Sequence, residues 1–323
     1  MKRHQAVCAA LFVAVGACGT AAAGTVYWDG TGTGWEAAGN WSTGSGSAAP
    51  DPETAPGAAD DVVFNISTLN TAQTVHLNGD QSAKSVTNST TGAVTVLGGG
   101  ADRTLTLGSG GLARTGNAAT VIGSPTSGQR VDLVVGADQT WLNSIAGSDI
   151  VISNAVSAAA TGDAATTNVL TLNAANKGFL FAGNGNTVAL RDGAAGRRLS
   201  LVKLGSGAVT LNSTNTYSGG TVINAGTVIL TATNALGSGP VVMAGGTIQH
   251  NVGTTLTNDI VAQAGTTSVL QGNSSGALVL SGNITGSGNP TASAWINYGS
   301  PQLAGNNSRS EEHTSELQSH LNL

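Results

Sequence analysis

The sequence predicts an all-β protein and, within that class, a β-solenoid in which short strands stack coil upon coil. Three observations support this prediction. Glycine accounts for 47 of the 323 residues, only 9% of the residues are charged, and hydrophobic residues still make up 40%. Ordinary domains have about 7% glycine and about 25% charged residues. The chain therefore combines frequent turns and an uncharged polar surface with enough apolar residues to form a core.

Short apolar runs recur along the chain, and most of them alternate an apolar residue with Thr. Such alternation directs one set of side chains to a core and the other to solvent, as in a β-strand. Leu211 and Leu230 lie 19 residues apart, which is close to the length of one solenoid coil. The runs are Leu105–Leu107, Leu170–Leu172, Val209–Leu211, Val228–Leu230 and Leu278–Leu280.

Turns rich in Gly, Asn and Ser separate these runs. We expect Gly219 and Gly220 at a coil corner that requires a positive φ, which glycine adopts without a steric penalty. Asn at strand ends tolerates the left-handed conformation and can stack its amide on a neighbouring coil. The Asn residues in such positions are Asn173, Asn212, Asn215, Asn224 and Asn234.

A β-sandwich of antiparallel hairpins is the alternative architecture. Aromatic residues make up only 4% of the chain, whereas a sandwich usually has a distinctive aromatic core. Stacked coils bury ladders of Val, Leu and Ile and need few large side chains. The composition therefore favours the solenoid.

Residues 1–23 have the features of a signal peptide. A positively charged start is followed by an apolar stretch and by an A-x-A site at Ala21–Ala23, which predicts cleavage before Gly24. Attachment of lipid to Cys18 is the alternative. Because Cys8 and Cys18 both lie in this segment, the mature chain is predicted to have no disulfide and no Cys-ligated metal.

The other end of the chain differs in composition. The segment from Arg309 to His320 is rich in charged residues, and translated back to codons it resembles a common sequencing adapter. We therefore expect residues 309–323 to be non-native. The remaining chain divides into a Trp-rich N-terminal cap at residues 24–64 and a β-solenoid at residues 65–308.

Charge and hydropathy exclude several classes of partner. The net charge of −5 and the pI of about 5.4 argue against nucleic acid as a partner. No segment of the mature chain is apolar enough to span a membrane.

Three tryptophans of the cap (Trp28, Trp35 and Trp41) either plug the first coil or form a platform for sugar rings, and we favour the plug.

The sequence predicts no catalytic, cofactor-binding or metal-binding residue. Gly30–Gly34 lacks the strand and helix context of a nucleotide-binding loop and is interpreted as a flexible turn. Two further groups of polar residues are interpreted as parts of turns rather than as sites. His76, Asp80 and Lys84 are interpreted as polar turn residues, and Asp60 and Asp61 as a cap on a turn.

Two other sets of charged residues were candidates for chemistry. One is a basic cluster, interpreted as a solvated loop rather than a contact to an anionic glycan. The other is a set of carboxylates with no common spacing. The basic cluster is Arg191, Arg197, Arg198 and Lys203, and the carboxylates are Asp132, Asp138, Asp149 and Asp163.

One part of the chain resembles a known family. K-x-G-x-G at Lys203–Gly207 is followed by N-T-Y-S-G-G-T at Asn215–Thr221 and by A-G-T at Ala225–Thr227. These units, within residues 201–249, resemble the autotransporter-associated β-strand repeat, also called the passenger-associated transport repeat. The resemblance implies a right-handed parallel β-helix exported to the surface or surroundings of a Gram-negative-type bacterium, and it brings no catalytic residue.

Two function classes follow. The first is a noncatalytic, adhesin-like surface or matrix protein whose partners are glycans or other cell-surface components. The alternative is a β-helical polysaccharide lyase or hydrolase. An enzyme of this kind needs an acidic cluster, or Asp together with Lys or Arg, on neighbouring coils, and the carboxylate spacing in the sequence does not predict one.

Overall fold

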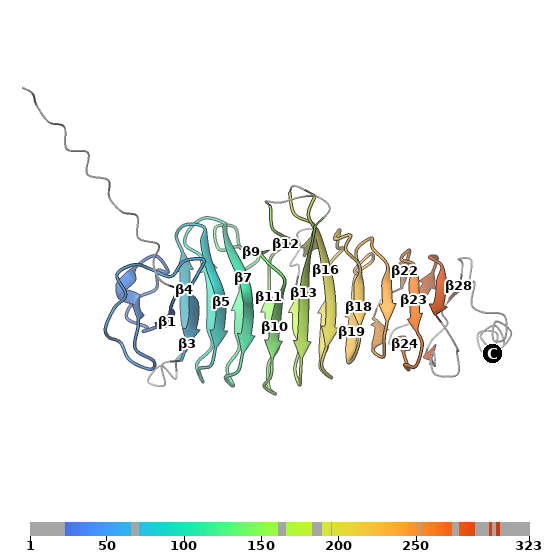
Figure 1. Cartoon of the computed structure of the whole chain (residues 1–323), viewed down its shortest axis with the longest axis horizontal. Coiled ribbons are helices and arrows are strands. Elements are labelled where there is room, and N and C mark those ends of the chain that lie inside the picture. The colour runs from blue at the N-terminus through green and yellow to red at the C-terminus, as the bar shows by residue number, and fades with distance from the viewer. Residues whose placement is uncertain are drawn as a thin grey trace, which may run out of the picture.

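The protein is an elongated stack of short strands that run across its long axis (Figure 1). The computed structural model describes residues 23–65, 71–160, 166–182, 189–194, 196–251, 253–272, 278–287, 297–298 and 302–303. The predicted signal peptide up to residue 22 and the segment 309–323 lie outside the described residues. No helix in the described part of the chain is long and apolar enough to cross a bilayer.

The largest sheet in the described part of the chain has 15 strands, and we call it the long sheet. The short 3-10 helix η1 (Ala38–Asn40) precedes its second strand. The strands of the long sheet are β1 (Thr25–Trp28), β2 (Trp41–Ser42), β3 (Asp61–Phe64), β5 (Gln81–Asn88), β7 (Arg103–Arg114), β9 (Val131–Val135), β10 (Gln139–Asn143), β12 (Val156–Ala158), β13 (Thr167–Ala174), β15 (Leu190–Arg191), β16 (Arg198–Leu204), β18 (Thr221–Ile223), β20 (Val241–Met243), β23 (Ile260–Gln263) and β26 (Ile284–Ser287).

Two further sheets complete the described coils. The second sheet comprises β4 (Gln73–Leu77), β6 (Val94–Gly98), β8 (Thr120–Ile122), β11 (Ile150–Ile152), β14 (Phe179–Phe181), β17 (Ala208–Leu211), β19 (Thr227–Leu230), β21 (Thr247–His250), β24 (Val269–Gly272) and β27 (Asn297–Tyr298). The third sheet comprises β22 (Thr254–Leu256), β25 (Leu278–Leu280) and β28 (Gln302–Leu303).

The strand pairing confirms the solenoid. Apart from β1 with β2, the strand pairs of the described chain are parallel, and each strand pairs with the strand one coil further along. Leu211 pairs with Leu230, as their 19-residue spacing predicted. Parallel pairing needs a crossover connection rather than a hairpin turn, so the β-sandwich alternative does not describe this fold.

Coil length divides the stack into two regions. Residues that pair in the second sheet lie 26 to 30 apart in sequence from β6 to β17, but 19 to 22 apart from β17 to β24. In the long coils the long sheet branches at β7, whose first residues pair with β9 and whose last residues pair with β10. The branch continues through β12 to β15. The extra residues of the long coils thus form a third strand, which we call the branch row.

The core is one continuous cluster of buried apolar side chains that runs from Val26 to Ile284. It forms because alternate residues of the strands point inward, as in β6 and β9, where every second residue is buried. Each coil therefore adds its inward residues to the same ladder.

The two corner glycines have different roles. Gly220 has a φ of +87°, as expected, whereas Gly219 has no positive φ. A Cβ at Gly219 would lie 2.4 Å from the carbonyl oxygen of Leu199, so this position requires glycine for close backbone approach.

The expected left-handed Asn conformation occurs at one of the five positions. Asn234 has a φ of +53° and is the one non-glycine residue with a positive φ in the described part of the chain. Amide-to-amide stacking between coils is also not the main Asn interaction. Asn212 donates to the carbonyl of Ala182, and Asn215 bonds the backbone of Leu190 and Ala235. These side chains bind the backbone of neighbouring coils, where unpaired groups at the corners need partners.

Candidate functional site

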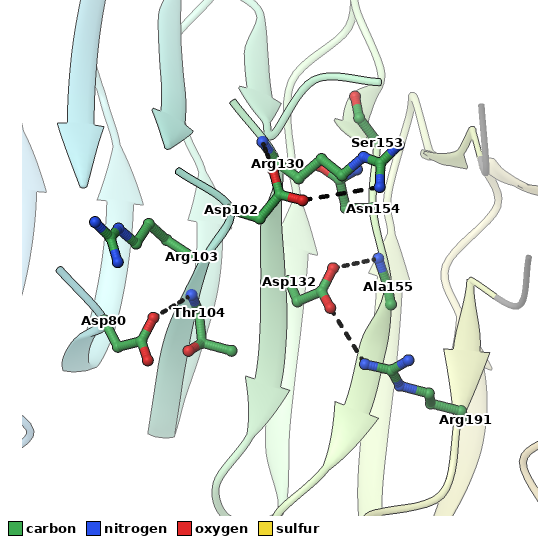
Figure 2. A pocket seen from close by; sticks show the side chains of 10 residues that line it. All are labelled: Asp80, Asp102, Arg103, Thr104, Arg130, Asp132, Ser153, Asn154, Ala155 and Arg191. Carbon is green, nitrogen blue, oxygen red and sulfur yellow. Dashed lines mark hydrogen bonds and ion pairs between the residues drawn. The ribbon is translucent and has the colours of Figure 1, made fainter. Parts of the chain in front are cut away.

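A groove lined by both acidic and basic side chains runs along the branch row (Figure 2). Its volume is about 530 Å³. Six of its lining side chains are charged, and they come from four coils. They are Asp80, Asp102, Arg103, Arg130, Asp132 and Arg191. The coil of β12, which lies between the coils of β9 and β15, contributes only uncharged residues to the lining.

The register of the branch row brings these residues together. Thr104 of β7 pairs with Asp132 of β9, and Arg191 of β15 pairs with Ser157 of β12. Asp80 precedes β5, which pairs with β7. The charged residues stand at or beside strand ends, where a coil turns its corner and a polar side chain can reach solvent.

Each groove carboxylate accepts a hydrogen bond from the backbone of the next coil. Asp80 accepts from the amide of Thr104 at 2.9 Å, Asp102 from Gly128 at 2.7 Å, and Asp132 from Ala155 at 3.1 Å. The amide of Thr104 thereby holds the pKa of Asp80 below its ordinary value. These carboxylates join successive coils at a corner that lacks a continuous strand ladder.

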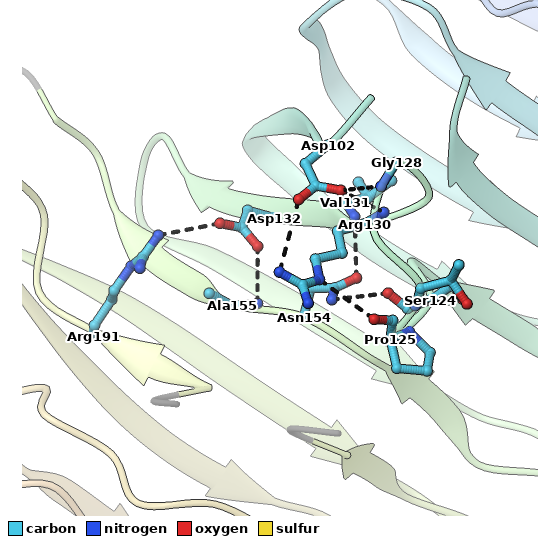
Figure 3. Close-up of polar contacts among 11 residues, drawn as sticks. Asp102, Ser124, Pro125, Gly128, Arg130, Val131, Asp132, Asn154, Ala155 and Arg191 are labelled. Atoms are coloured by element: carbon cyan, nitrogen blue, oxygen red, sulfur yellow. Dashed lines mark hydrogen bonds and ion pairs between the residues drawn. The ribbon is translucent and has the colours of Figure 1, made fainter. Parts of the chain in front are cut away.

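The arginines of the groove are held by few contacts (Figure 3). Arg191 Nη2 lies 3.2 Å from the Oδ2 of Asp132, and Arg130 Nη1 lies 3.8 Å from the Oδ2 of Asp102. Arg130 also donates from Nε to the carbonyl of Pro125. The Nε of Arg103 is buried and has no hydrogen-bond partner among the described residues. Both ion pairs are substantially exposed, and exposed pairs contribute little stability.

The same carboxylate-to-amide contact recurs outside the groove. Asp138 accepts from the amide of Val169 and Asp149 from the amide of Gly178, each at 2.8 Å. Asp163 lies outside the described residues. Although the sequence showed no common spacing among these carboxylates, Asp132, Asp138 and Asp149 share one structural role. Unequal coil lengths hide it, since the number of residues between an Asp and the amide that donates to it varies from coil to coil.

The structure removes Lys203 from the predicted basic cluster. Arg191 lies in the groove, and Arg198 is exposed at the start of β16. Lys203 is only 2% exposed and points into the solenoid. The interpretation of these residues as one solvated loop was therefore wrong for Lys203, because β16 places the side chains of Arg198 and Lys203 on opposite faces.

The remaining polar residues considered in the sequence form contacts within strands and turns. Lys84 pairs with Asp61 at 2.8 Å rather than with Asp80. Asp60 accepts from the amide of Gly57, which is the turn cap that was predicted. His76 lies in β4 and accepts a hydrogen bond at its carbonyl from Trp35. Among the residues that the structure describes, no three His, Cys, Asp or Glu side chains gather as metal ligands would.

Trp28, Trp35 and Trp41 are buried, so none of them offers an open face to a sugar ring. Trp41 lies edge-on to both other rings at centroid distances of 4.9 and 5.0 Å. The indole nitrogen of Trp41 donates to the carbonyl of Trp35 at 2.7 Å. Within the predicted turn Gly30–Gly34, which lies between Trp28 and Trp35, Gly34 forms a bridge with His76. The tryptophans thus lie in the core beneath β1 and β2, at the end of the long sheet.

Inside the short coils, a buried lysine joins two of the sequence motifs. Lys203 Nζ donates to the carbonyls of Leu204 and Gly205 at 2.7 Å and to that of Ala225 at 3.2 Å. A Cβ at Gly226 would lie 2.6 Å from this nitrogen, so glycine leaves room for it. Burial lowers the pKa of Lys203 to about 8. The K-x-G-x-G and A-G-T units therefore meet around one ammonium group.

A side chain of the N-T-Y-S-G-G-T unit joins the two regions of the stack. Asn215 accepts from the amide of Leu190 in β15 at 2.9 Å and donates to the carbonyl of Ala235 at 2.6 Å. The branch row ends at β15, and Asn215 provides the hydrogen bonds to the neighbouring coils beyond that strand. Tyr217 is fully buried beside Asn215, with its hydroxyl 2.7 Å from the Oγ1 of Thr221.

Comparison with known proteins identifies this part of the stack. No curated protein and no solved structure matches the chain. Residues 201–230 match the family model of the Passenger-associated-transport-repeat. These residues span β16 to β19 and include Lys203, Asn215 and Ala225. The chain therefore carries a passenger-associated transport repeat, the repeat of autotransporter passengers, within a parallel β-solenoid.

Proposed function

We propose that the protein is a noncatalytic, adhesin-like protein that is exported to the bacterial cell surface or its surroundings. The passenger-associated transport repeat at residues 201–230 is the observation that carries this proposal. The predicted signal peptide before Gly24 and the Gram-negative-type surface location belong to the same proposal. In it, residues 24–64 cap the first coil, and the polar sides of residues 65–308 contact glycans or other cell-surface components.

The contacts of the carboxylates support a binding role rather than a catalytic one. Asp80, Asp102 and Asp132 each use one oxygen to bond the next coil. A general acid in glycoside cleavage needs a raised pKa, whereas the pKa of Asp80 is lowered. No residue is proposed as catalytic, and no metal or cofactor is part of the function.

A polysaccharide lyase or hydrolase is the second candidate, and one observation favours it. Asp and Arg from neighbouring coils do meet in the groove, which is the arrangement that such an enzyme would need. A reducing-end assay on plant and algal polysaccharides, with and without calcium, separates the two functions. Turnover that disappears in Asp132→Asn would establish the enzyme and contradict the proposal.

Export is tested on producing cells. We expect the chain in the medium or accessible to protease on intact cells, with Gly24 as its first residue. Recovery of the chain only from the cytoplasm would contradict the proposal. A lipidated Cys18 at the mature terminus would replace the cleavage site but would leave export intact.

A further inference from the structure

The charged groove has hydrogen-bond acceptors that are largely occupied. Asp102 Oδ1 accepts from the amides of Gly128 and Arg130, and its Oδ2 faces the guanidinium of Arg130. Asp132 is engaged in the same way, by Ala155 and Arg191. The neighbouring Asn154 accepts from Val131 and donates to Ser124. A ligand therefore finds few acceptors that are not already used within the protein.

The groove has hydrogen-bond donors to spare. A guanidinium has five N–H donors. The contacts of Arg191 in the described chain engage one terminal nitrogen, and those of Arg130 engage Nε and one terminal nitrogen. The buried Nε of Arg103 has no partner among the described residues. The side chains of Arg130 and Arg191 are 32% and 46% exposed, so a ligand can reach them.

The donors are arranged in a row. Arg103, Arg130 and Arg191 come from β7, from the residue before β9 and from β15, and the branch row runs β7, β9, β12, β15. With neighbouring strands about 4.8 Å apart, the row spans three strand spacings, or about 14 Å along the stack. This length suits several units of a polymer rather than a single small anion.

The lining also restricts the kind of polymer. None of the described lining residues is aromatic, so a neutral sugar chain would have no ring face to stack on there. The interleaved Asp residues repel a ligand whose negative charges fall opposite them. Such charges give specificity by rejecting wrong spacings.

We propose that this groove binds an acidic polysaccharide, whose carboxylate or sulfate groups are bound by Arg103, Arg130 and Arg191. This inference rests on the proposed function as a surface binding protein and names its ligand class and site. The exposed ion pairs to Asp102 and Asp132 are weak enough to open and turn their arginines toward the ligand. Planar guanidinium groups suit such oxyanions because they can donate two parallel hydrogen bonds.

The test measures binding by calorimetry on the full chain. Polygalacturonate supplies carboxylates, dextran sulfate supplies sulfates, and dextran and double-stranded DNA serve as comparison ligands. We expect binding to one of the two acidic polysaccharides, weakened about tenfold in Arg130→Gln or Arg191→Gln, the size of a lost charged hydrogen bond. Asp102→Asn keeps an oxygen for Gly128 but loses the repelling charge, so it should strengthen binding.

The matched control is Arg198→Gln, which removes the same charge from an exposed position outside the groove lining. It should leave the affinity unchanged. Equal losses in Arg130→Gln and Arg198→Gln would overturn the inference, and so would equal affinity for dextran or DNA. Circular dichroism confirms that each variant folds.

The results distinguish a failure of this inference from a failure of the proposed function. Release of reducing ends during the titration would contradict a noncatalytic role while leaving the binding site in place. Export with no binding to either acidic polysaccharide would leave the proposed function standing and remove this inference.

Discussion

The long coils and the short coils of this solenoid differ in how they close the third side of each coil. Between β8 and β17 each coil has a third strand, and the branch row closes the third side with backbone hydrogen bonds. In the repeat that follows, turns replace this strand, and side chains such as Asn215 bond the neighbouring backbone instead. The extra residues of the long coils form the groove, whereas the short coils lack this third strand and close with fewer residues.

The buried cations, in contrast, have a similar role in the two regions. In the long coils Arg114 is fully buried and donates to the carbonyls of Asn117, Ala118 and Ser148. In the short coils Lys203 has a similar role with three carbonyls. Both regions therefore use one buried cation to satisfy backbone carbonyls at a corner, where strand pairing cannot.

The largest effect is expected for Arg114→Leu in the long coils. The substitution removes the Arg114 donor from the carbonyls of Asn117, Ala118 and Ile145, whereas Ser148 still accepts from Asn143. Each buried group that loses its partner costs about 1–3 kcal/mol. We expect a loss of about 3–5 kcal/mol in the free energy of unfolding, measured by urea denaturation. Arg198→Leu is the control at an exposed position, and a similar change in both variants would show that Arg114 is not an internal tie.

The pH dependence of stability should reveal Lys203 in the short coils. Its pKa is about 8 in the folded chain, against 10.5 for an ordinary lysine. Between these values the unfolded chain binds more protons, so stability rises with pH by up to about 3 kcal/mol. Below pH 8 both states are protonated and this dependence disappears. Lys203→Met should lack the rise in urea denaturation from pH 7.5 to 10.5, and identical slopes in both proteins would refute the shifted pKa.

A smaller effect is expected at the corner glycines. Gly220→Val places a branched side chain at a φ of +87°, which should cost about 1–3 kcal/mol. Gly219→Val should also destabilise, because its Cβ meets the backbone of Leu199. Gly57→Ala is the control, since its Cβ would meet its nearest neighbour at 3.9 Å. Unchanged urea midpoints for both corner variants would remove the requirement for glycine there.

The smallest effect is expected for the ion pair between Lys84 and Asp61. The pair is partly exposed, so Lys84→Gln should cost at most about 1 kcal/mol. Burial tends to raise the pKa of Asp61, but hydrogen bonds from Lys84 and Ser85 and the charge of Lys84 outweigh it and lower the pKa. The stabilisation is therefore present above the ordinary value near 3.9 and disappears as the pH falls through the folded pKa. A larger effect at pH 3 than at pH 7 would reverse this interpretation.

The stacked strands could be predicted from the sequence because their signal is local. Val209–Leu211 and Val228–Leu230 show the alternation and the coil length directly, and their strands do pair. The motifs around Lys203 could also be recognised in the sequence. Their meaning could not, because only the fold brings Ala225 within reach of the Lys203 ammonium group.

The groove could not be predicted in the same way. Asp80, Asp102 and Asp132 meet only through the register of coils of unequal length. Arg103 and Arg130 gave no motif, and Arg191 was grouped with the wrong neighbours. Asp residues just before apolar runs, as at Asp132 and Asp149, were the available signal, since that position is where a carboxylate reaches the next coil.

Hydrogen exchange on the full chain with and without the acidic polysaccharide tests the central claim most directly. That claim is that the groove of the long coils binds the ligand and that the short coils do not. The account predicts slower amide exchange around residues 102–104, 130–132 and 153–155, and unchanged exchange in β18 to β21. Protection confined to the short coils, or spread equally over both regions, would contradict it.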